Sequence, residues 1–328
     1  MEDRHKKNIL IMLLLFIILV ISFFISVGYG AVKITPKEII QAFFDSEKGV
    51  NYQIIFNIRL PRTIVAMLVG MALALAGVIL QGVMGNNLAT PNIIGVSSGA
   101  GLTALTILIL YPQYFYLVPL GAFVGAFIAT MFIYSLSWKD GVLPTRLILA
   151  GVAVNSILGA GNSILISLFP DRVAGSISFM VGGLGGAKWK DVRMVFPYIL
   201  IGVIVTLLLS DKLNILVLGD EVATGLGLKV EKTRFAFIII SSLLAGSAVS
   251  VAGLLGFVGL IVPHMARMFV GTDHKYLFPA SILLGSIVVM VCDLLARIIF
   301  APKEIAVGII MSILGGPFFL YLLRKKEV

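Results

Sequence analysis

Three ionisable residues near the end of the chain could do chemistry inside a membrane. Asp293 and Arg297 are four positions apart in an apolar run, and Glu304 follows shortly afterwards. Charged side chains in apolar segments are costly unless they pair or face a pathway. Two interpretations follow. In the first interpretation, the three residues relay protons or ions in an ion-coupled secondary transporter. In the second, Asp293 and Arg297 form an i, i+4 pair that positions the ends of helices.

The histidines and the cysteine favour neither metal nor redox chemistry. His5, His264 and His274 are far apart and lack an HxxxH spacing, so we expect no metal site. Cys292 is the single cysteine and forms no intramolecular disulfide. For His264 and the neighbouring Arg267 we predict a structural role, such as bonding the carbonyl groups of an interrupted helix. The paired groups that an intramembrane enzyme needs are not apparent in the sequence.

A polar stripe runs along the apolar segment 146–168. Gly151, Asn155, Gly159 and Asn162 are spaced so that they share one face of a helix. Buried amides are costly unless they face protein or water. We therefore expect this stripe to face a transport pathway or partner subunit, or to make hydrogen bonds to a neighbouring helix.

The composition is that of a polytopic membrane protein. Of 328 residues 59% are hydrophobic and 12% are charged, and the mean hydropathy is +1.08. Soluble domains are about half apolar. The net charge of +9 is spread over short loops and both termini, which is typical of membrane flanks and not of a nucleic-acid surface. We expect contact with lipid and no nucleic-acid partner.

The apolar runs predict an all-α fold with about ten transmembrane helices in a single domain, residues 1–328. The first run is long enough to be retained as a span. An even number places both termini on one side, and a small excess of Lys and Arg there predicts the cytoplasm. Glycines at 253–259 predict an interrupted helix. The ten predicted segments are 8–29, 62–82, 93–110, 116–136, 146–168, 192–210, 234–252, 256–270, 277–296 and 305–323.

The polar segment 211–233 contains the pattern of a short helix. We expect Asp220 to cap its start, Glu221 to lie at the positive end of the helix dipole, and Gly225 or Gly227 to end it. Val222 and Leu226 would share one face. The residues alone fit an ordinary interfacial loop as well as a docking element. A second polar segment, 30–61, includes Lys33, Lys37 and Lys48, for which a docking role is one explanation.

Six motifs occur in an order that resembles FecCD-type permeases. These proteins are the membrane subunits of iron-siderophore, haem and cobalamin ATP-binding-cassette importers of type II. The motifs are RLPR at 59–62, NLATP at 87–91, GLLGFVGLIVPHMAR at 253–267, DLLAR at 293–297, EIAVG at 304–308 and GGPFF at 315–319.

The resemblance implies the type II importer permease fold and a transport function. It implies a second permease copy, identical or paralogous, two cytoplasmic ATPase subunits and an extracytoplasmic substrate-binding protein. The location would be the bacterial cytoplasmic membrane, and the cargo a ferric siderophore, with haem and cobalamin next. Because the sequence has no GxxxxGK[ST] motif, we expect no ATPase site and no bound cofactor here, with ATP and Mg held by the partner ATPases.

The resemblance also implies roles for individual residues. Arg59, Arg62 and Arg297 would dock the binding protein through carboxylates; lipid headgroups are the alternative for Arg59 and Arg62, and pairing with Asp293 for Arg297. Predicted pathway and gate residues are Asn86, Leu88 and Thr145, together with Asn155 and Asn162 of the polar stripe. The predicted ATPase-coupling residues are Gly219, Asp220, Glu221, Val222, Ala223, Gly225, Leu226 and Gly227.

Overall fold

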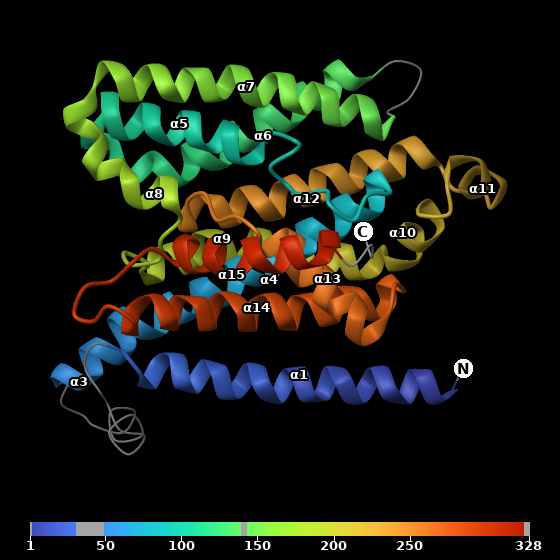
Figure 1. The fold of residues 1–328 in the computed structure, drawn as a ribbon, viewed down its shortest axis with the longest axis horizontal. Coiled ribbons are helices and arrows are strands. Elements are labelled where there is room, and N and C mark those ends of the chain that lie inside the picture. The colour runs from blue at the N-terminus through green and yellow to red at the C-terminus, as the bar shows by residue number, and fades with distance from the viewer. Residues whose placement is uncertain (1, 31–48, 139–142, 325–328) are drawn as a thin grey trace.

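The computed structural model describes residues 2–30, 49–138 and 143–324, and its elements are helices that form one elongated bundle (Figure 1). Each of the ten predicted segments overlaps one apolar helix of the structure. These helices are α1 (Glu2–Gly28), α4 (Leu60–Met84), α5 (Val96–Leu110), α6 (Val118–Ser137), α7 (Pro144–Leu168), α9 (Trp189–Leu208), α12 (Val230–Ala252), α13 (Val258–Val270), α14 (His274–Ile298) and α15 (Val307–Arg324).

The predicted all-α membrane fold is confirmed. In the part of the chain that the structure describes, seven helices are long and apolar enough to cross a membrane, while α5, α13 and α15 are shorter apolar helices. The span containing α4 begins earlier than predicted, because the π-helix η1 (Gln53–Arg59) continues directly into it.

The two ends of the bundle differ in their short elements. Both termini lie at one end, which we call the terminal end, together with α10 (Ser210–Leu216) and α11 (Asp220–Gly225) (Figure 1). The opposite, distal end includes α3 (Val50–Tyr52), α8 (Ile177–Val181) and the connection from α14 to α15. The remaining short elements are the 3-10 helices η2 (Pro112–Leu117) and η3 (Pro170–Ser176).

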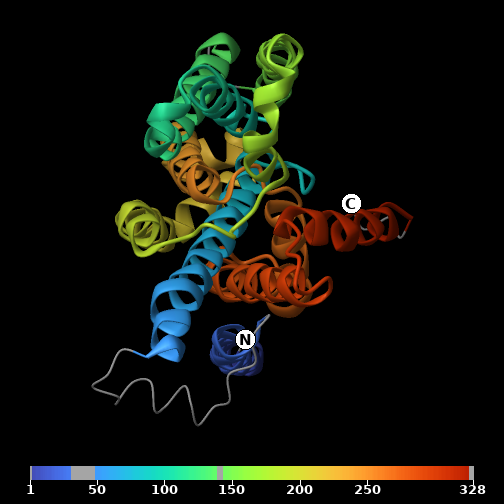
Figure 2. The ribbon, with the colours of Figure 1, turned by 90° about the vertical axis from the view of Figure 1, so that its left-hand side faces the viewer.

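Helix α4 lies at the centre of the bundle, where it contacts α14, α12, α13 and α9 (Figure 2). Its neighbour α14 comes close because both helices have glycine at the contact. A Cβ added to Gly70 would lie 2.1 Å from the carbonyl oxygen of Gly285. Such approach allows extensive packing contact between helices in a membrane. Ala74, one turn further along α4, also lies against Gly285, so small side chains on α4 permit this close approach.

The interrupted helix is also confirmed. Helix α12 ends at Ala252 and α13 begins at Val258, with positive φ angles at Gly253 (70°) and Phe257 (65°). Leu254 N–H donates to the carbonyl of Phe179 at 2.9 Å. In the same segment, 179–183, Gly183 N–H donates to the carbonyl of Ala252, the last residue of α12, at 2.9 Å. Backbone that leaves the helix at membrane depth is tolerated when protein satisfies its polar groups in this way.

Candidate functional site

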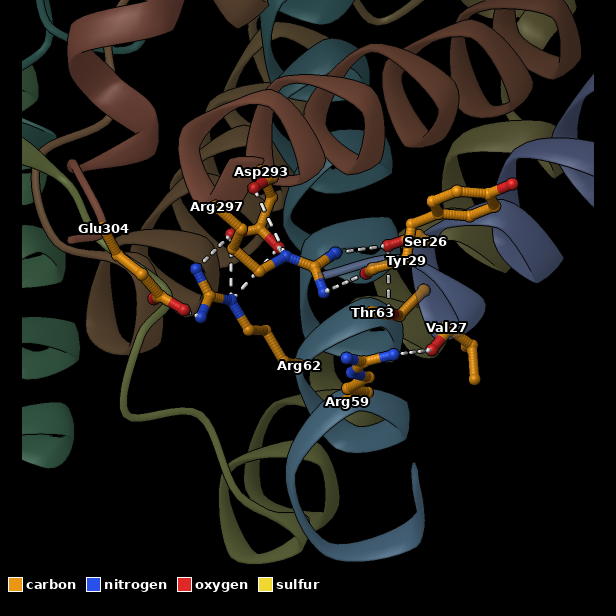
Figure 3. Close-up of polar contacts among 9 residues, drawn as sticks. All are labelled: Ser26, Val27, Tyr29, Arg59, Arg62, Thr63, Asp293, Arg297 and Glu304. Atoms are coloured by element: carbon orange, nitrogen blue, oxygen red, sulfur yellow. Dashed lines mark hydrogen bonds and ion pairs between the residues drawn. The ribbon is translucent and has the colours of Figure 1, made fainter. Parts of the chain in front are cut away.

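A buried ion cluster lies at the distal end, where α4 meets α14 (Figure 3). Arg62 Nη2 and Nε donate to Asp293 Oδ1 at 2.9 and 3.0 Å, and Nε also lies 3.1 Å from Oδ2. Asp293 is fully buried and Arg62 is 6% exposed. The planar fork of a guanidinium suits this two-point contact with a carboxylate.

Arg297 connects the same carboxylate to α1. Its Nε lies 3.2 Å from Asp293 Oδ2, and its Nη2 donates to Ser26 Oγ at 2.7 Å. Ser26 Oγ is in turn 3.1 Å from Thr63 Oγ1 on α4. The predicted i, i+4 pair of Asp293 and Arg297 is therefore confirmed, and this pair joins α14 to two further helices.

Arg59 holds the end of α1. Its Nη1 donates to the carbonyl oxygens of Val27 at 3.1 Å and Gly28 at 2.7 Å (Figure 3). The last carbonyl groups of a helix have no partner within the helix and form its negative end, so a guanidinium stabilises them. Arg59 is 5% exposed, which does not fit the alternative of lipid-headgroup anchoring.

Glu304 completes the cluster from the connection between α14 and α15. Its Oε2 accepts from Arg62 Nη1 at 2.7 Å, while its side chain stays 42% exposed. Arg62 and Glu304 line a cavity of about 390 Å³ together with residues from the segments 177–185 and 305–309. Of the members of the cluster, Glu304 is therefore the one best placed to exchange its partner. We call Arg59, Arg62, Asp293, Arg297 and Glu304 the distal ion cluster.

The structure gives the three predicted docking arginines contacts inside the chain. The exposed fraction is at most 6% for each of them. Docking of a binding protein on these residues stays a prediction, and it would require groups of the distal ion cluster to exchange partners. Lys33, Lys37 and Lys48 lie outside the described residues.

At the terminal end, α11 forms the predicted short helix, but it starts differently. Gly219 precedes it with φ at 100°, and within the described chain no side chain caps its first turn. Asp220 instead accepts from Arg234 Nη2 of α12 at 2.7 Å. The predicted capping role of Asp220 was wrong because Gly219 takes the N-cap position and Asp220 is the first residue inside the helix. Asp220 and Glu221 do lie in the first turn, where the helix dipole favours negative charge.

The end of α11 agrees with the sequence. Leu228 N–H donates to Ala223 at 3.0 Å and Gly227 N–H donates to Thr224 at 2.9 Å. Gly227 has φ at 81°, so these two bonds form a Schellman motif, in which glycine avoids the cost of a left-handed residue. Ala223 is fully buried, whereas Val222 and Leu226 are 51% and 62% exposed. The helix thus presents an apolar face away from the bundle.

A polar contact that sequence reasoning missed fastens α10 to α14. Asn214 Nδ2 donates to Asp273 Oδ1 at 2.8 Å, and Asn214 Oδ1 accepts from the backbone N–H of His274 at 3.0 Å. Asp273 caps α14 through Lys275 N–H. An aspartate before an apolar run is a signal for such a cap, but nothing local indicates that Asn214 binds there.

The polar stripe of α7 faces its neighbour α5 and the turn before it. Asn155 Nδ2 donates to the carbonyl of Asn92 at 2.9 Å, and its Oδ1 accepts from Ser98. A Cβ on Gly151 would lie 2.0 Å from the carbonyl oxygen of Ile93. Hydrogen bonding between helices is therefore confirmed for Asn155. At Asn162, the side-chain nitrogen lies near Gly101 of α5.

The predicted gate residues lie in different elements. Asn86 Oδ1 accepts from Leu88 N–H at 2.8 Å and so shapes the turn that follows α4. Thr145 is exposed at the second position of α7. The gate itself stays a prediction.

Arg267 is linked to the interrupted helix through a glutamine. Its Nη2 donates to Gln81 Oε1, and Gln81 Nε2 donates to the carbonyl of Gly259 at 3.2 Å. The ring of His264 lies edge-on to Phe318. This arrangement fits the predicted structural role of Arg267, which acts on a carbonyl group near the start of α13.

A bundle of apolar helices with an interrupted helix and a buried ion cluster is typical of a polytopic membrane protein. The sequence matches the FecCD transport family over residues 18–325, and the chain belongs to this family.

Two relatives match nearly the whole chain. This chain is 38% identical over 322 residues to the Fe(3+)-citrate import system permease protein YfmE of Bacillus subtilis. The match covers 98% of this chain and 96% of YfmE. The chain is 39% identical over 338 residues to the hemin transport system permease protein HmuU of Yersinia pestis, with 100% and 99% covered.

A solved structure has the same fold. It is described as an inward-facing conformation of a putative metal-chelate type ABC transporter, with a TM-score of 0.86 and 31% sequence identity; the match covers 96% of this chain and 99% of that one.

Proposed function

We propose that this chain is the permease subunit of an ATP-binding-cassette importer that moves a ferric siderophore, or else haem or cobalamin, across the bacterial cytoplasmic membrane. The observation that supports this most is the family match over residues 18–325. Relatives named for ferric citrate and hemin support a bulky iron chelate as the cargo class.

The terminal end would face the cytoplasm and the distal end the outside. Two ATPase subunits would bind ATP and Mg and contact the terminal end, so that this chain needs neither an ATPase site nor a cofactor. A second permease copy, identical or paralogous, would complete the pathway. A substrate-binding protein would deliver cargo at the distal end.

We propose that α11 transmits movement from the ATPases. The exposed side chains of Val222 and Leu226 form an apolar contact surface, and the exposed carboxylates of Asp220 and Glu221 lie beside it. The pair of Asp220 with Arg234 connects α11 to the N-terminal part of α12. Pressure on α11 would therefore act on a helix that continues to the interrupted backbone.

We propose the distal ion cluster as part of the docking region for the binding protein. Its three arginines exceed its two carboxylates by one charge, which favours an acidic partner surface. The exposed Glu304 would leave Arg62 when a carboxylate of the partner replaces it. Asn86, Leu88 and Thr145 are proposed at the cytoplasmic gate, with Asn155 and Asn162 lining the approach.

Reconstitution tests the function directly. The chain is purified with the ATPases that accompany it and placed in vesicles, and uptake of ferric citrate, a ferric hydroxamate and haem is measured. We expect uptake of at least one chelate that requires ATP. Uptake by the chain alone, driven by an ion gradient, would favour a secondary transporter that uses Asp293, Arg297 and Glu304.

A further inference from the structure

Helix α14 carries two residues of the distal ion cluster and contacts α10, the helix next to α11. At the terminal end its first turn is bound by Asn214 of α10, the short helix that precedes α11. At the distal end its residues Asp293 and Arg297 bind α4 and α1. A continuous helix of this length spans about 37 Å at 1.5 Å per residue, so α14 links the two sides of a membrane.

The terminal contact uses both polar atoms of one amide. Asn214 Nδ2 donates to Asp273 Oδ1 at 2.8 Å, and Oδ1 accepts from His274 N–H at 3.0 Å and lies 2.6 Å from His274 Nδ1. On the same helix, Leu213 and Leu216 are buried. Buried leucine side chains therefore hold α10 to the bundle, and the side-chain amide of Asn214 fixes its position relative to the start of α14.

The path from α10 to the distal end leaves little room for independent movement. The backbones of α4 and α14 are in direct contact at Gly70 and Gly285. Beside this contact, Ser286 Oγ of α14 donates to the carbonyl of Met67 of α4 at 3.2 Å. Closely packed elements move as units because packed interfaces do not deform continuously. A displacement at the first turn of α14 would thus reach Asp293 and Arg297.

We propose that Asn214 is a positioning residue through which movement of the α10–α11 segment, residues 210–225, is passed to α14 and to the distal ion cluster. The proposal rests on the proposed coupling function of α11. It adds a second route beside the pair of Asp220 with Arg234, which acts on α12. The Asn214 route ends at the cluster proposed for docking, so it would connect ATP binding with the outer face.

An exchange of the two partners tests the route. Asn214→Asp places two carboxylates in contact, whereas Asn214→Asp combined with Asp273→Asn restores an amide–carboxylate pair in the opposite direction. The acceptors for His274 N–H and Lys275 N–H are kept in the double variant. Lys212→Ala, an exposed position on α10, is the matched control.

The measurement is made on the complex with its co-purified ATPases in lipid nanodiscs. A fluorophore on Lys303→Cys, in the exposed connection after α14, reports the change caused by ATP with vanadate; the native Cys292 is buried. Binding of ATP, its hydrolysis and thermal stability are measured on the same samples. We expect Asn214→Asp to reduce the fluorescence change at least fivefold with hydrolysis within twofold, and the double variant and Lys212→Ala to match the parent.

Each outcome decides the proposal. A full fluorescence change in Asn214→Asp would overturn it. If Asn214→Asp assembles poorly, recovery in the double variant supports the route, and failure to recover overturns it. Substitution of both Asp220 and Glu221 by Lys in the same assay separates the two proposals. A normal fluorescence change in that variant removes α11 from coupling. A lost fluorescence change in that variant, together with a normal one in Asn214→Asp, removes only the α14 route.

Discussion

The two ends of α14 are held by polar contacts of opposite character. At the distal end, Asp293 is fully buried and shared by two buried arginines. At the terminal end, Asn214 binds the first turn beside the exposed Asp273. Buried charges are strongly destabilising when one partner is lost, whereas contacts near water contribute little to stability. The distal contacts are therefore expected to contribute more to the stability of the bundle than the contact of Asn214 at the terminal end.

The largest effect on stability is expected from Asp293→Asn. Arg62 and Arg297 would lose the charge that they share and remain buried, at a cost of about 3–5 kcal/mol. Unfolding in detergent micelles with increasing denaturant measures this loss. Asp171→Asn in the exposed η3 is the control and should change nothing. Loss of a partner from a buried ion pair should cost more than about 1 kcal/mol of unfolding free energy. A smaller loss for Asp293→Asn would show that the distal contact of α14 is no more stabilising than the terminal one.

A smaller effect is expected from Gly70→Ala. The added Cβ would meet the carbonyl oxygen of Gly285 at 2.1 Å, so α4 and α14 must separate, at about 1–3 kcal/mol. Gly159→Ala on α7 is the matched control, because nothing lies within 4 Å of its added Cβ. The same unfolding assay compares the two variants. Equal stability would mean that the contact between α4 and α14 is looser than described.

The smallest effect within the distal ion cluster is expected from Glu304→Gln. The carboxylate is 42% exposed and Arg62 keeps Asp293, so the loss should be about 0.2–1 kcal/mol. If Glu304 competes with a docking partner for Arg62, the same variant should bind the co-purified binding protein several-fold more tightly. Biolayer interferometry on the nanodisc complex measures that affinity, and weaker binding would contradict the competition.

Local patterns were sufficient for the helices and for contacts within one helix. The ten apolar segments, the interruption at 253–257 and the pair of Asp293 with Arg297 depend on neighbours in sequence, so periodicity and spacing predict them. The partner of Arg62 could not be predicted, because Asp293 lies 231 positions away. Asp220 was assigned to a cap because its residue type favours that position, and the sequence does not show that the helix begins one residue earlier than expected, after Gly219.

The polar stripe of α7 shows an intermediate case. Spacing places Asn155 and Gly151 on one face of the helix, and the structure keeps them there. Which neighbour that face meets depends on packing of α5 and the turn at 92–95, and a single sequence does not encode that choice in a local pattern.

The central claim is that work done on α11 by ATPase subunits drives transport. The most direct measurement is the ratio of chelate taken up to ATP hydrolysed in vesicles, compared between the parent complex and the double charge reversal of Asp220 and Glu221 to Lys. We predict that hydrolysis continues and that uptake per ATP falls at least tenfold. An unchanged ratio, with the variant assembled to the same extent, would contradict the account.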